Sequence, residues 1–403
     1  MIKLFNDPVH GFIEVPTGLI LQLVNHPYVQ RMRRIRQLGL TSLVYPGAVH
    51  SRFSHVLGAM YLMQQALNTL RSKGVEITDH EYEQAQVAIL LHDIGHAPFS
   101  HALEFVLLDG YHHETIGRAV MARLNDELGG RITTALQIFE GSYPKPFLHQ
   151  LVSGQLDTDR LDYLMRDSFF TGVQEGIVGT DRILKTLNVF EGQLVVEEKG
   201  VYSIEKLIIA RRLMYWQVYL HKTVMSAEQL LIRLLSRAKA LFAAGEQLWL
   251  DDSLTYFFRQ GPAQTLTEAT LAHYMALDDE DILYAIKRWQ SSDDRLLADL
   301  STRLLERKLL KLQYYDQPVA PAILQERMAY HAQKTGYATE EMAYLVFEGS
   351  TSNLAYGLGG TDEPIRILGK DGRVRPLTEA TDLPNFRDLT HPVIRYYLCQ
   401  PGG

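Results

Sequence analysis

Hydrophobic side chains recur every three or four residues along most of the chain, which is the spacing of one face of an α-helix. This pattern predicts one helix from Ser51 to Leu70 and another from Glu114 to Leu128. Shorter stretches bounded by glycine, proline or asparagine predict β-hairpins at residues 2–15 and 365–377. The chain is therefore predicted to be mainly α, with short N-terminal and peripheral β-hairpins.

Other elements follow from local signals. Thr78 and Glu81 have the spacing of a capping box, so a helix is expected to begin there and to end at His92. The remaining predictions are an arginine-rich helix at 28–38, a strand pair at 188–196 and 200–203 that turns at Gly192, and one long helix at 205–241. The arginines of the first of these suit either a solvated face or contact with phosphate or an acidic partner.

Composition limits the class of protein. The 403 residues carry a formal charge of −7, which does not suit a general nucleic-acid coat, although a local basic pocket for nucleic acid is not excluded. The single cysteine, Cys399, rules out an internal disulfide framework and fits the cytoplasm, and the absence of a long apolar run predicts no membrane span. We expect a main domain at 1–320 and a small mixed α/β C-terminal region at 321–403.

One stretch, residues 88–114, is unusually rich in groups that ionise near neutral pH or below. The apolar run Val87–Leu91 leads directly into His92 and Asp93, and Gly95 and Pro98 then end the helix. The stretch holds His92, Asp93, His96, His101, Glu104, His113 and Glu114. Unpaired charge beside a core segment is costly, and a bound metal ion would offset that cost.

Two more residues complete a possible ligand set. His55 lies near the start of a predicted apolar helix, one turn after Arg52, and Asp159 lies in an acidic helix where it shares a face with Asp162. The acid before it, Asp157, is interpreted as facing solvent. The predicted metal ligands are His55, His92, Asp93 and Asp159.

Two imidazoles and two carboxylates suit one divalent ion per site, with Mn, Fe, Zn, Co, Ni and Mg all compatible. Open coordination positions could hold water and a phosphate oxygen. His101 and Glu104 are three residues apart, so the carboxylate could orient the imidazole as a general acid. These residues predict a metal-dependent phosphohydrolase.

The order of these residues resembles the HD superfamily of metal-dependent phosphohydrolases. The segments NDPVHGFIEV, RQLGLTSLVYPGAVHSRFSHVLG, LLHDIGHAPFSH, HHE, DRLDYLMRD and VYLHK, within residues 1–225, resemble its deoxynucleoside triphosphate (dNTP) triphosphohydrolase, or dGTPase-like, branch. The resemblance implies a helical HD core, a homo-oligomer that is a dimer or tetramer, and hydrolysis of a dNTP at the α-phosphorus. The products would be deoxynucleoside and tripolyphosphate.

The resemblance also implies roles for single residues. The catalytic group would comprise His96, His101, Glu104, His113 and Glu114. Phosphate would contact Arg52, Arg160 and Lys222, and the sugar and base would lie among Gln37, Leu38, Tyr163, Asp167 and Tyr219. A possible nucleotide effector would bind near Asn6, Asp7, Asn25 and Arg33.

Three positions depart from the relatives. Glu104 and Arg160 stand where a relative has Asp and Lys, and Asn25 stands where the vertebrate enzyme uses an acidic residue to bind an activating guanine. The effector therefore stays unassigned. Two alternatives remain open, namely another nucleotide phosphohydrolase (a monophosphatase or phosphodiesterase) and a non-catalytic nucleotide-sensing HD protein.

Overall fold

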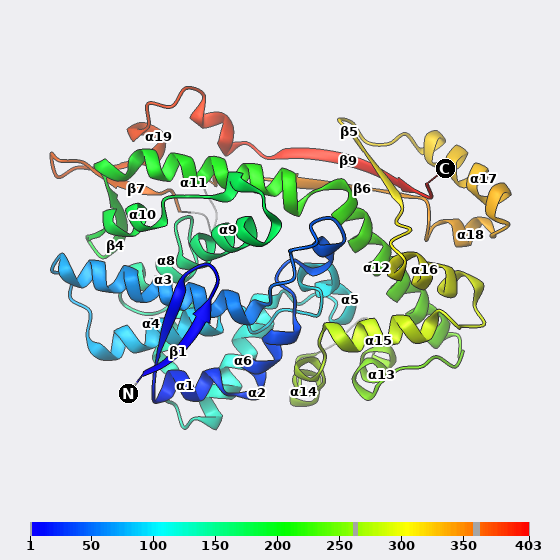
Figure 1. Cartoon of the computed structure of the whole chain (residues 1–403), viewed down its shortest axis with the longest axis horizontal. Helices are drawn as coiled ribbons and strands as arrows, with labels where there is room; N and C mark the ends of the chain where they lie inside the picture. The colour runs from blue at the N-terminus through cyan, green and yellow to red at the C-terminus, as the bar shows by residue number, and fades with distance from the viewer. Residues whose placement is uncertain (1, 261–264, 358–362, 403) are drawn as a thin grey trace.

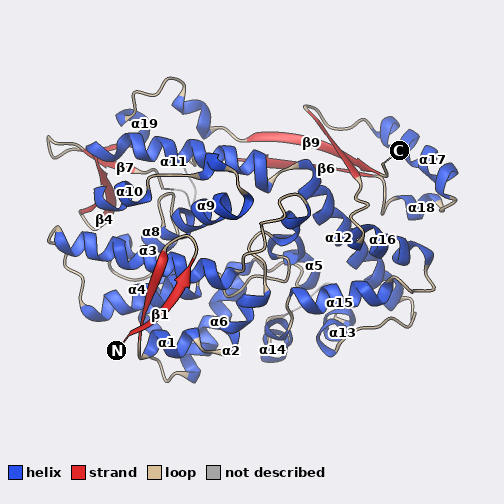
Figure 2. Ribbon diagram, in the orientation of Figure 1, coloured by secondary structure: helices blue, strands red, loops and turns tan. Residues whose placement is uncertain are grey.

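The computed structural model describes residues 2–260, 265–357 and 363–402 and is mainly helical, as predicted (Figures 1 and 2). Helices of the N-terminal half occupy one side of the molecule, and α13 to α16 occupy the other. Two long strands, β6 and β9, run along one edge above both groups. Within the described residues, no helix combines the length and the apolar character that crossing a bilayer requires.

The N-terminal hairpin is confirmed as β1 (Ile2–Asp7) and β2 (Gly11–Pro16). Gly11 closes the turn with a positive φ of 76°, a conformation that favours glycine. Ile13 and Val15 are buried on one face of the hairpin, whereas Phe12 is exposed on the other. This alternation fixes the register, because a shift of one residue would expose the buried side chains.

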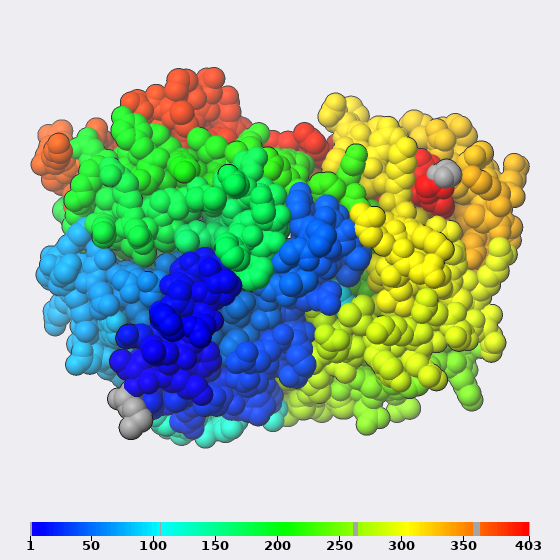
Figure 3. Space-filling view, viewed as in Figure 1, coloured from blue at the N-terminus to red at the C-terminus, as the bar shows by residue number. Residues whose placement is uncertain are grey.

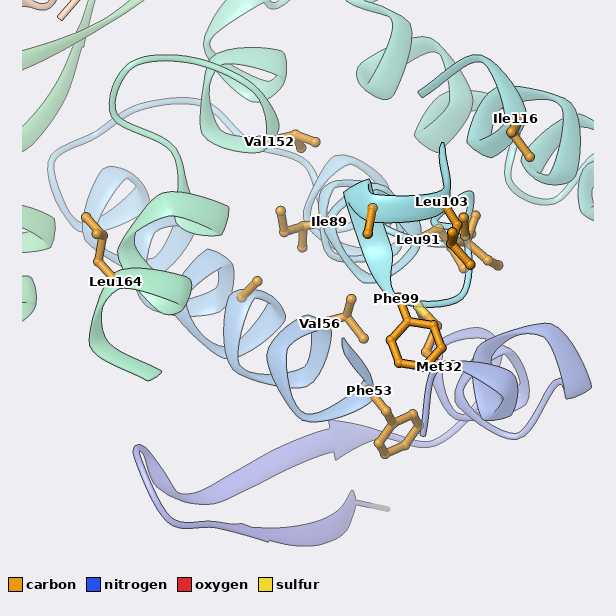
Figure 4. Packing of buried hydrophobic residues seen from close by; sticks show 14 of the residues in the cluster. Met32, Phe53, Val56, Ile89, Leu91, Phe99, Leu103, Ile116, Val152 and Leu164 are labelled. Carbon is orange, nitrogen blue, oxygen red and sulfur yellow. The ribbon is translucent and has the colours of Figure 1, made fainter. Parts of the chain in front are cut away.

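Three helices position the site. Helix α3 (Arg52–Ser72) lies between α4 (Asp79–Leu91) and α9 (Thr158–Thr171). The capping box at the start of α4 is confirmed, because Thr78 accepts from the backbone of Glu81 and Glu81 accepts from that of Thr78. Buried side chains pack between these helices and the segment that follows α4, as Figure 4 shows for Val56, Ile89, Leu91, Phe99, Leu103 and Leu164.

The remaining helices surround this core. They are α1 (Leu19–Val24), α2 (Pro27–Arg31), α5 (Glu104–Leu107), α6 (His113–Glu127), α7 (Thr133–Glu140), α8 (Pro146–Val152), α10 (Thr180–Thr186), α11 (Val201–Met214), α12 (Lys222–Ala243), α13 (Asp252–Arg259), α14 (Glu268–Ala276), α15 (Asp279–Trp289), α16 (Arg295–Leu305), α17 (Pro321–Thr335), α18 (Thr339–Met342) and α19 (Leu377–Ala380). Short 3-10 turns connect several of them, including Gly39–Leu43 and Ser100–Leu103.

Two small sheets join distant parts of the chain. One has the order β3 (Leu187–Phe190), β4 (Gln193–Glu197), β7 (Arg366–Leu368) and β8 (Val374–Pro376). The other has the order β5 (Lys311–Tyr315), β9 (Val393–Gln400) and β6 (Phe347–Asn353). The β7–β8 hairpin is confirmed, and the second sheet combines strands from both sides of the expected boundary at residue 320.

Three predicted elements were wrong in their bounds. The arginine-rich segment is helical only through Arg34, and Ile35 is already extended. The strand that pairs with β3 is β4, directly after Gly192, whereas residues 201–203 begin α11. The long helix at 205–241 is interrupted by a π-helical turn at Tyr215–Tyr219 and by a break before α12. Local sequence did not reveal these ends because neighbouring segments impose them through tertiary contacts.

The arginines of this segment mostly serve the fold. Arg31 is buried and donates to the carbonyl oxygens of Leu277 and His96 at 2.7 and 3.0 Å. Arg34 pairs with Asp278, and the Arg33 guanidinium lies 3.6 Å from the centre of the Phe53 ring.

The interpretation of Asp157 as solvent-facing was wrong. Its side chain is buried, caps the start of α9 by accepting from the backbone N–H of Arg160, and also lies 3.2 Å from that residue's Nε. Burial raises the pKa of Asp157 to about 6.

Helices α3 and α9 approach each other closely at Gly58. A Cβ there would lie 2.0 Å from Asp162 Oδ1 and 2.3 Å from an Arg166 nitrogen. We predict that Gly58→Ala lowers the free energy of unfolding by about 1–3 kcal/mol through overpacking, although alanine ordinarily favours a helix. Urea unfolding measures the change, with Gln65→Ala on the exposed face of α3 as control. An unchanged urea midpoint for Gly58→Ala would contradict the close approach.

Candidate functional site

The four residues predicted as metal ligands converge at one point. His55 Nε2 lies 3.1 Å from Asp159 Oδ1, His92 Nε2 lies 3.3 Å from the same oxygen, and the two imidazole nitrogens are 3.4 Å apart. Asp93 completes the group, with its carboxylate oxygens 3.4 Å from His92 Nε2 and 3.7 Å from His55 Nε2. The residues come from the start of α3, the end of α4 and the first turn of α9.

The end of α4 explains how two adjacent residues can face one centre. His92 is the C-cap of the helix, and the chain turns immediately after it. His92 Nδ1 donates to the carbonyl of Ile89 at 2.6 Å, which leaves Nε2 directed at the centre. The carboxylate of Asp93 binds Arg52.

The outer nitrogen of His55 is held by a carboxylate. His55 Nδ1 lies 2.7 Å from Asp162 Oδ2, and both side chains are fully buried. A metal-binding imidazole usually donates its second N–H in this way, which fixes the tautomer and aims the other nitrogen at the ion. The donor set therefore fits a divalent metal.

The N-terminal hairpin reaches the same carboxylate. His10 Nε2 lies 2.6 Å from Asp162 Oδ1, and Arg166 Nε donates to Asp162 Oδ2 at 2.8 Å. Arg166 also pairs with Asp7 at 2.8 Å, so both ends of the hairpin turn are tied to α9. Figure 3 shows the hairpin, in dark blue, lying against the green segment that contains α9. Asp7, predicted near an effector, thus points inward.

The pKa values of the residues at the centre are shifted by their close contacts with one another. Burial acts to lower the pKa of His55, but hydrogen bonds to Asp159 and Asp162 raise it to about 10. Burial likewise acts to raise the pKa of Asp93, but the nearby Arg52 charge holds it well below its usual range. The pKa of Asp159 is also lowered against the effect of burial, by His92 and His55. A divalent cation would neutralise the carboxylates that protonated imidazoles neutralise here.

A cavity of about 430 Å³ opens beside the centre. Of the residues predicted to bind substrate, seven line it, namely Gln37, Leu38, Arg52, Arg160, Tyr163, Asp167 and Tyr219. The eighth, Lys222, is exposed at the start of α12 and does not line the cavity.

The predicted catalytic cluster is only partly assembled as expected. His96 and His113 line the cavity, with their rings stacked at 4.0 Å. His113 Nδ1 donates to Glu104 Oε1 at 2.6 Å, so this carboxylate orients His113. The side chain of His101, which the sequence pairs with Glu104, lies outside the described residues. Glu114 is exposed on α6 and does not line the cavity.

The pKa of His96 is well below its usual range. Burial is the main cause, and the Arg52 charge adds to it. His96 is therefore neutral at physiological pH.

Several site residues carry no recognisable sequence signal. His50 Nε2 and the Tyr219 hydroxyl both hold Asp167, at 2.7 and 2.8 Å. Ser100 accepts from Arg52 Nε at 3.0 Å, and its backbone adopts a positive φ of 57°. His10, which contacts Asp162, and Glu228, which lines the cavity, were also not predicted from the sequence. The partners of His10 and His50 are more than a hundred residues away, so no local spacing could have indicated them.

Two histidines and two aspartates at the edge of a cavity form a donor set that suits a metal-dependent hydrolase. Comparison with known proteins agrees. Residues 52–146 match the HD domain model, and residues 178–260 match the HD associated region. The chain belongs to the HD phosphohydrolase family.

Individual relatives refine this placement. The crystal structure of a phosphohydrolase from Bacteroides thetaiotaomicron is similar over 100% of both chains, with 46% identity and a TM-score of 0.96. The uncharacterized protein YwfO of Bacillus subtilis is 34% identical over 93% of this chain and 87% of its own length. The SAMHD1 homolog of Dictyostelium discoideum, a deoxynucleoside triphosphate triphosphohydrolase, is 30% identical over 61% of this chain. The match covers 51% of that homolog.

Asp162 should control metal binding without being a ligand. We predict that Asp162→Asn weakens Mn²⁺ binding about 10- to 100-fold, because the amide holds His55 less firmly in the required tautomer. Calorimetric titration of metal-stripped protein measures the dissociation constant, and circular dichroism checks that the variant is folded. Asp181→Asn, at an exposed acid on α10, is the control. Unchanged affinity in folded Asp162→Asn would contradict the role assigned to this carboxylate.

Proposed function

We propose that the protein is a metal-dependent dNTP triphosphohydrolase that releases deoxynucleoside and tripolyphosphate. The observation that carries the proposal is the layout of the cavity. The ligand cluster lies at its wall beside two arginines, Arg52 and Arg160, and the wall continues through Tyr163, Asp167 and Tyr219. Positive side chains suit a polyphosphate, and the hydroxyls and carboxylate suit a sugar.

The ligand set His55, His92, Asp93 and Asp159 would hold one divalent ion. A bound ion supplies Lewis-acid stabilisation of phosphoryl charge and lowers the pKa of a bound water. A mixed set of nitrogen and oxygen donors is compatible with several divalent metals, so it does not identify the native metal.

The chain's own side chains bind and orient the substrate. Arg160 lines the cavity and is fixed because its Nε donates to the carbonyl of Gly154 at 2.6 Å. Arg52 is fixed by Ser100 and Asp93. Asp167, held by His50 and Tyr219, is placed to accept from a sugar hydroxyl.

We assign the role of general acid to His113 in this proposal. Glu104 accepts from His113 Nδ1 and so orients the ring at the cavity wall, where the imidazole would protonate the leaving 5′ oxygen. His96 stacks on the His113 ring. Because His96 is neutral, it adds no positive charge beside a protonated His113.

The proposal includes a homo-oligomer and leaves the nucleotide effector unassigned. The outer face of the N-terminal hairpin exposes Ile2, Leu4 and Phe12 by 55, 58 and 66%, and a second copy of the chain could cover such an apolar face. Of the effector residues predicted from the resemblance, Asn6 and Asp7 lie on β1, Asn25 ends α1 and Arg33 lies in the 3-10 turn Met32–Arg34, and Asp7 points inward to Arg166.

Product analysis tests the reaction directly. Purified protein, stripped and reloaded with Mn²⁺ or Mg²⁺, is incubated with each of the four dNTPs, with and without GTP or dGTP, and analysed by mass spectrometry. Deoxynucleoside with tripolyphosphate is expected. Monophosphate with pyrophosphate would point to a different nucleotide phosphohydrolase, and no product under any condition would favour a nucleotide sensor.

The metal cluster can be tested with Asp159→Ala. We predict that this change removes the bound metal and lowers kcat about a thousandfold or more, because a metal supplies several kcal/mol of transition-state stabilisation. Elemental analysis and the tripolyphosphate assay measure the two effects, with Asp181→Asn as the matched control. Full activity in metal-free Asp159→Ala protein would refute the assignment of the centre.

A further inference from the structure

Asp279 is a buried acid that does not line the cavity and that the mechanism above does not use. It is the first residue of α15, in the group of helices that lies across the molecule from the N-terminal half (Figure 1). Its Oδ1 accepts the backbone N–H of Phe99 at 2.7 Å, and its Oδ2 accepts that of Arg36 at 3.0 Å. Burial raises the pKa of Asp279 to about 6 against the effect of these N–H groups, so the carboxyl is ionised at neutral pH and both oxygens accept.

The two segments that this carboxylate joins both belong to the cavity wall. Phe99 and Ser100 line the cavity in the loop that follows α4, and Gln37 lines it directly after Arg36. The Ser100 hydroxyl donates to the carbonyl of Arg36 at 2.9 Å. Asp279, Phe99, Ser100 and Arg36 therefore form a closed set of hydrogen bonds, called here the Asp279 network.

The loop needs this support because its backbone is unfavourable. Phe99 and Ser100 have φ values of 55° and 57°, in the left-handed region that residues with a side chain rarely adopt. Such a conformation persists where the surrounding structure holds it. The side chain of Phe99 is buried in the core (Figure 4), and its N–H is held by Asp279.

The end of α14 contacts the same loop. The Tyr274 hydroxyl donates to the carbonyl of Gly95 at 3.0 Å, and Arg31 joins the carbonyl oxygens of Leu277 and His96. The connection between α14 and α15 therefore holds this loop at several points along its length.

The Asp279 network leads to Arg52. The Ser100 hydroxyl accepts from Arg52 Nε at 3.0 Å, so the guanidinium is anchored on the network. The backbone N–H of Arg52 donates to the carbonyl of Ile35 at 2.9 Å, directly before Arg36. The side chain and the backbone of this arginine are thus both positioned by segments that Asp279 holds.

We propose that Asp279 is a positioning residue that aims Arg52 at the phosphate of the substrate. The inference rests on the proposed function, because it takes Arg52 as a phosphate-binding residue. A planar guanidinium binds phosphate oxygens through two parallel N–H groups only when its plane is correctly oriented. A small movement of Ser100 would turn that plane and weaken the contact.

Asp279→Asn tests the proposal because it keeps the shape of the side chain and turns one acceptor into a donor that faces a backbone N–H. We expect kcat/KM for dNTPs to fall about tenfold, which corresponds to the loss of one hydrogen bond to a charged group. Glu280→Gln, at the next position on α15 and exposed, is the control. Circular dichroism checks that both variants are folded.

A double-mutant cycle with Arg52→Ala separates positioning from a general structural role. If Asp279 acts through Arg52, then Asp279→Asn should lower kcat/KM less than twofold in the Arg52→Ala background, because coupled residues are not additive. A fall by the same factor in both backgrounds would overturn the inference, because it would show that Asp279 supports the fold alone.

Ser100→Ala tests the same network from its other end, and it serves if Asp279→Asn does not fold. The change removes the hydroxyl on which Arg52 is anchored, so kcat/KM is again expected to fall about tenfold. The effect should also disappear in the Arg52→Ala background. Unchanged kcat/KM in folded Ser100→Ala would contradict the proposed route to Arg52.

Phosphate binding without turnover distinguishes this inference from the proposed reaction. Metal-stripped protein is titrated calorimetrically with tripolyphosphate, and the dissociation constant is expected to rise about tenfold in Asp279→Asn and to stay unchanged in Glu280→Gln. This result would support positioning even if no dNTP is hydrolysed. Hydrolysis of dNTPs that Asp279→Asn leaves unchanged would overturn the inference and leave the proposed function standing, and wild-type protein that neither hydrolyses dNTPs nor binds tripolyphosphate would overturn both.

Discussion

The buried carboxylate of Asp162 is the contact on which the rest of the site depends. It receives the imidazole of His55 on one oxygen, the imidazole of His10 on the other, and the guanidinium of Arg166 across both. A fully buried acid is stable only when such partners compensate its charge. Because the partners come from the N-terminal hairpin, α3 and α9, satisfying this one group fixes three elements relative to one another.

The same constraint explains why α3 and α9 must touch. Gly58 leaves room for Asp162 and Arg166 in the space where any other residue would place a Cβ. Close approach brings His55 on α3 within reach of Asp159 on α9. The geometry of the metal ligands is thus a result of helix packing as much as of their own chemistry.

Charge then organises the cavity. Two arginines, each held by neighbouring groups, line the same cavity as two carboxylates of the proposed ligand cluster, so the cavity wall offers charges of both signs close together.

Hydrophobic spacing and turn residues by themselves determined the mainly helical class, the N-terminal hairpin and the capping box that begins α4. These features depend on residues near one another in the chain, where propensity and spacing act directly. The four residues proposed as metal ligands were also found from sequence, because imidazoles and acids beside an apolar run are costly unless they meet an ion.

Which groups hold and orient the proposed metal ligands was decided by the tertiary structure alone. The burial of Asp157, the inward turn of Asp7 and the contact of His50 with Asp167 all arise from segments that meet only in the folded chain. Contacts across a hundred or more residues leave no periodic trace in a single sequence. They are set by which surfaces the packed core brings together.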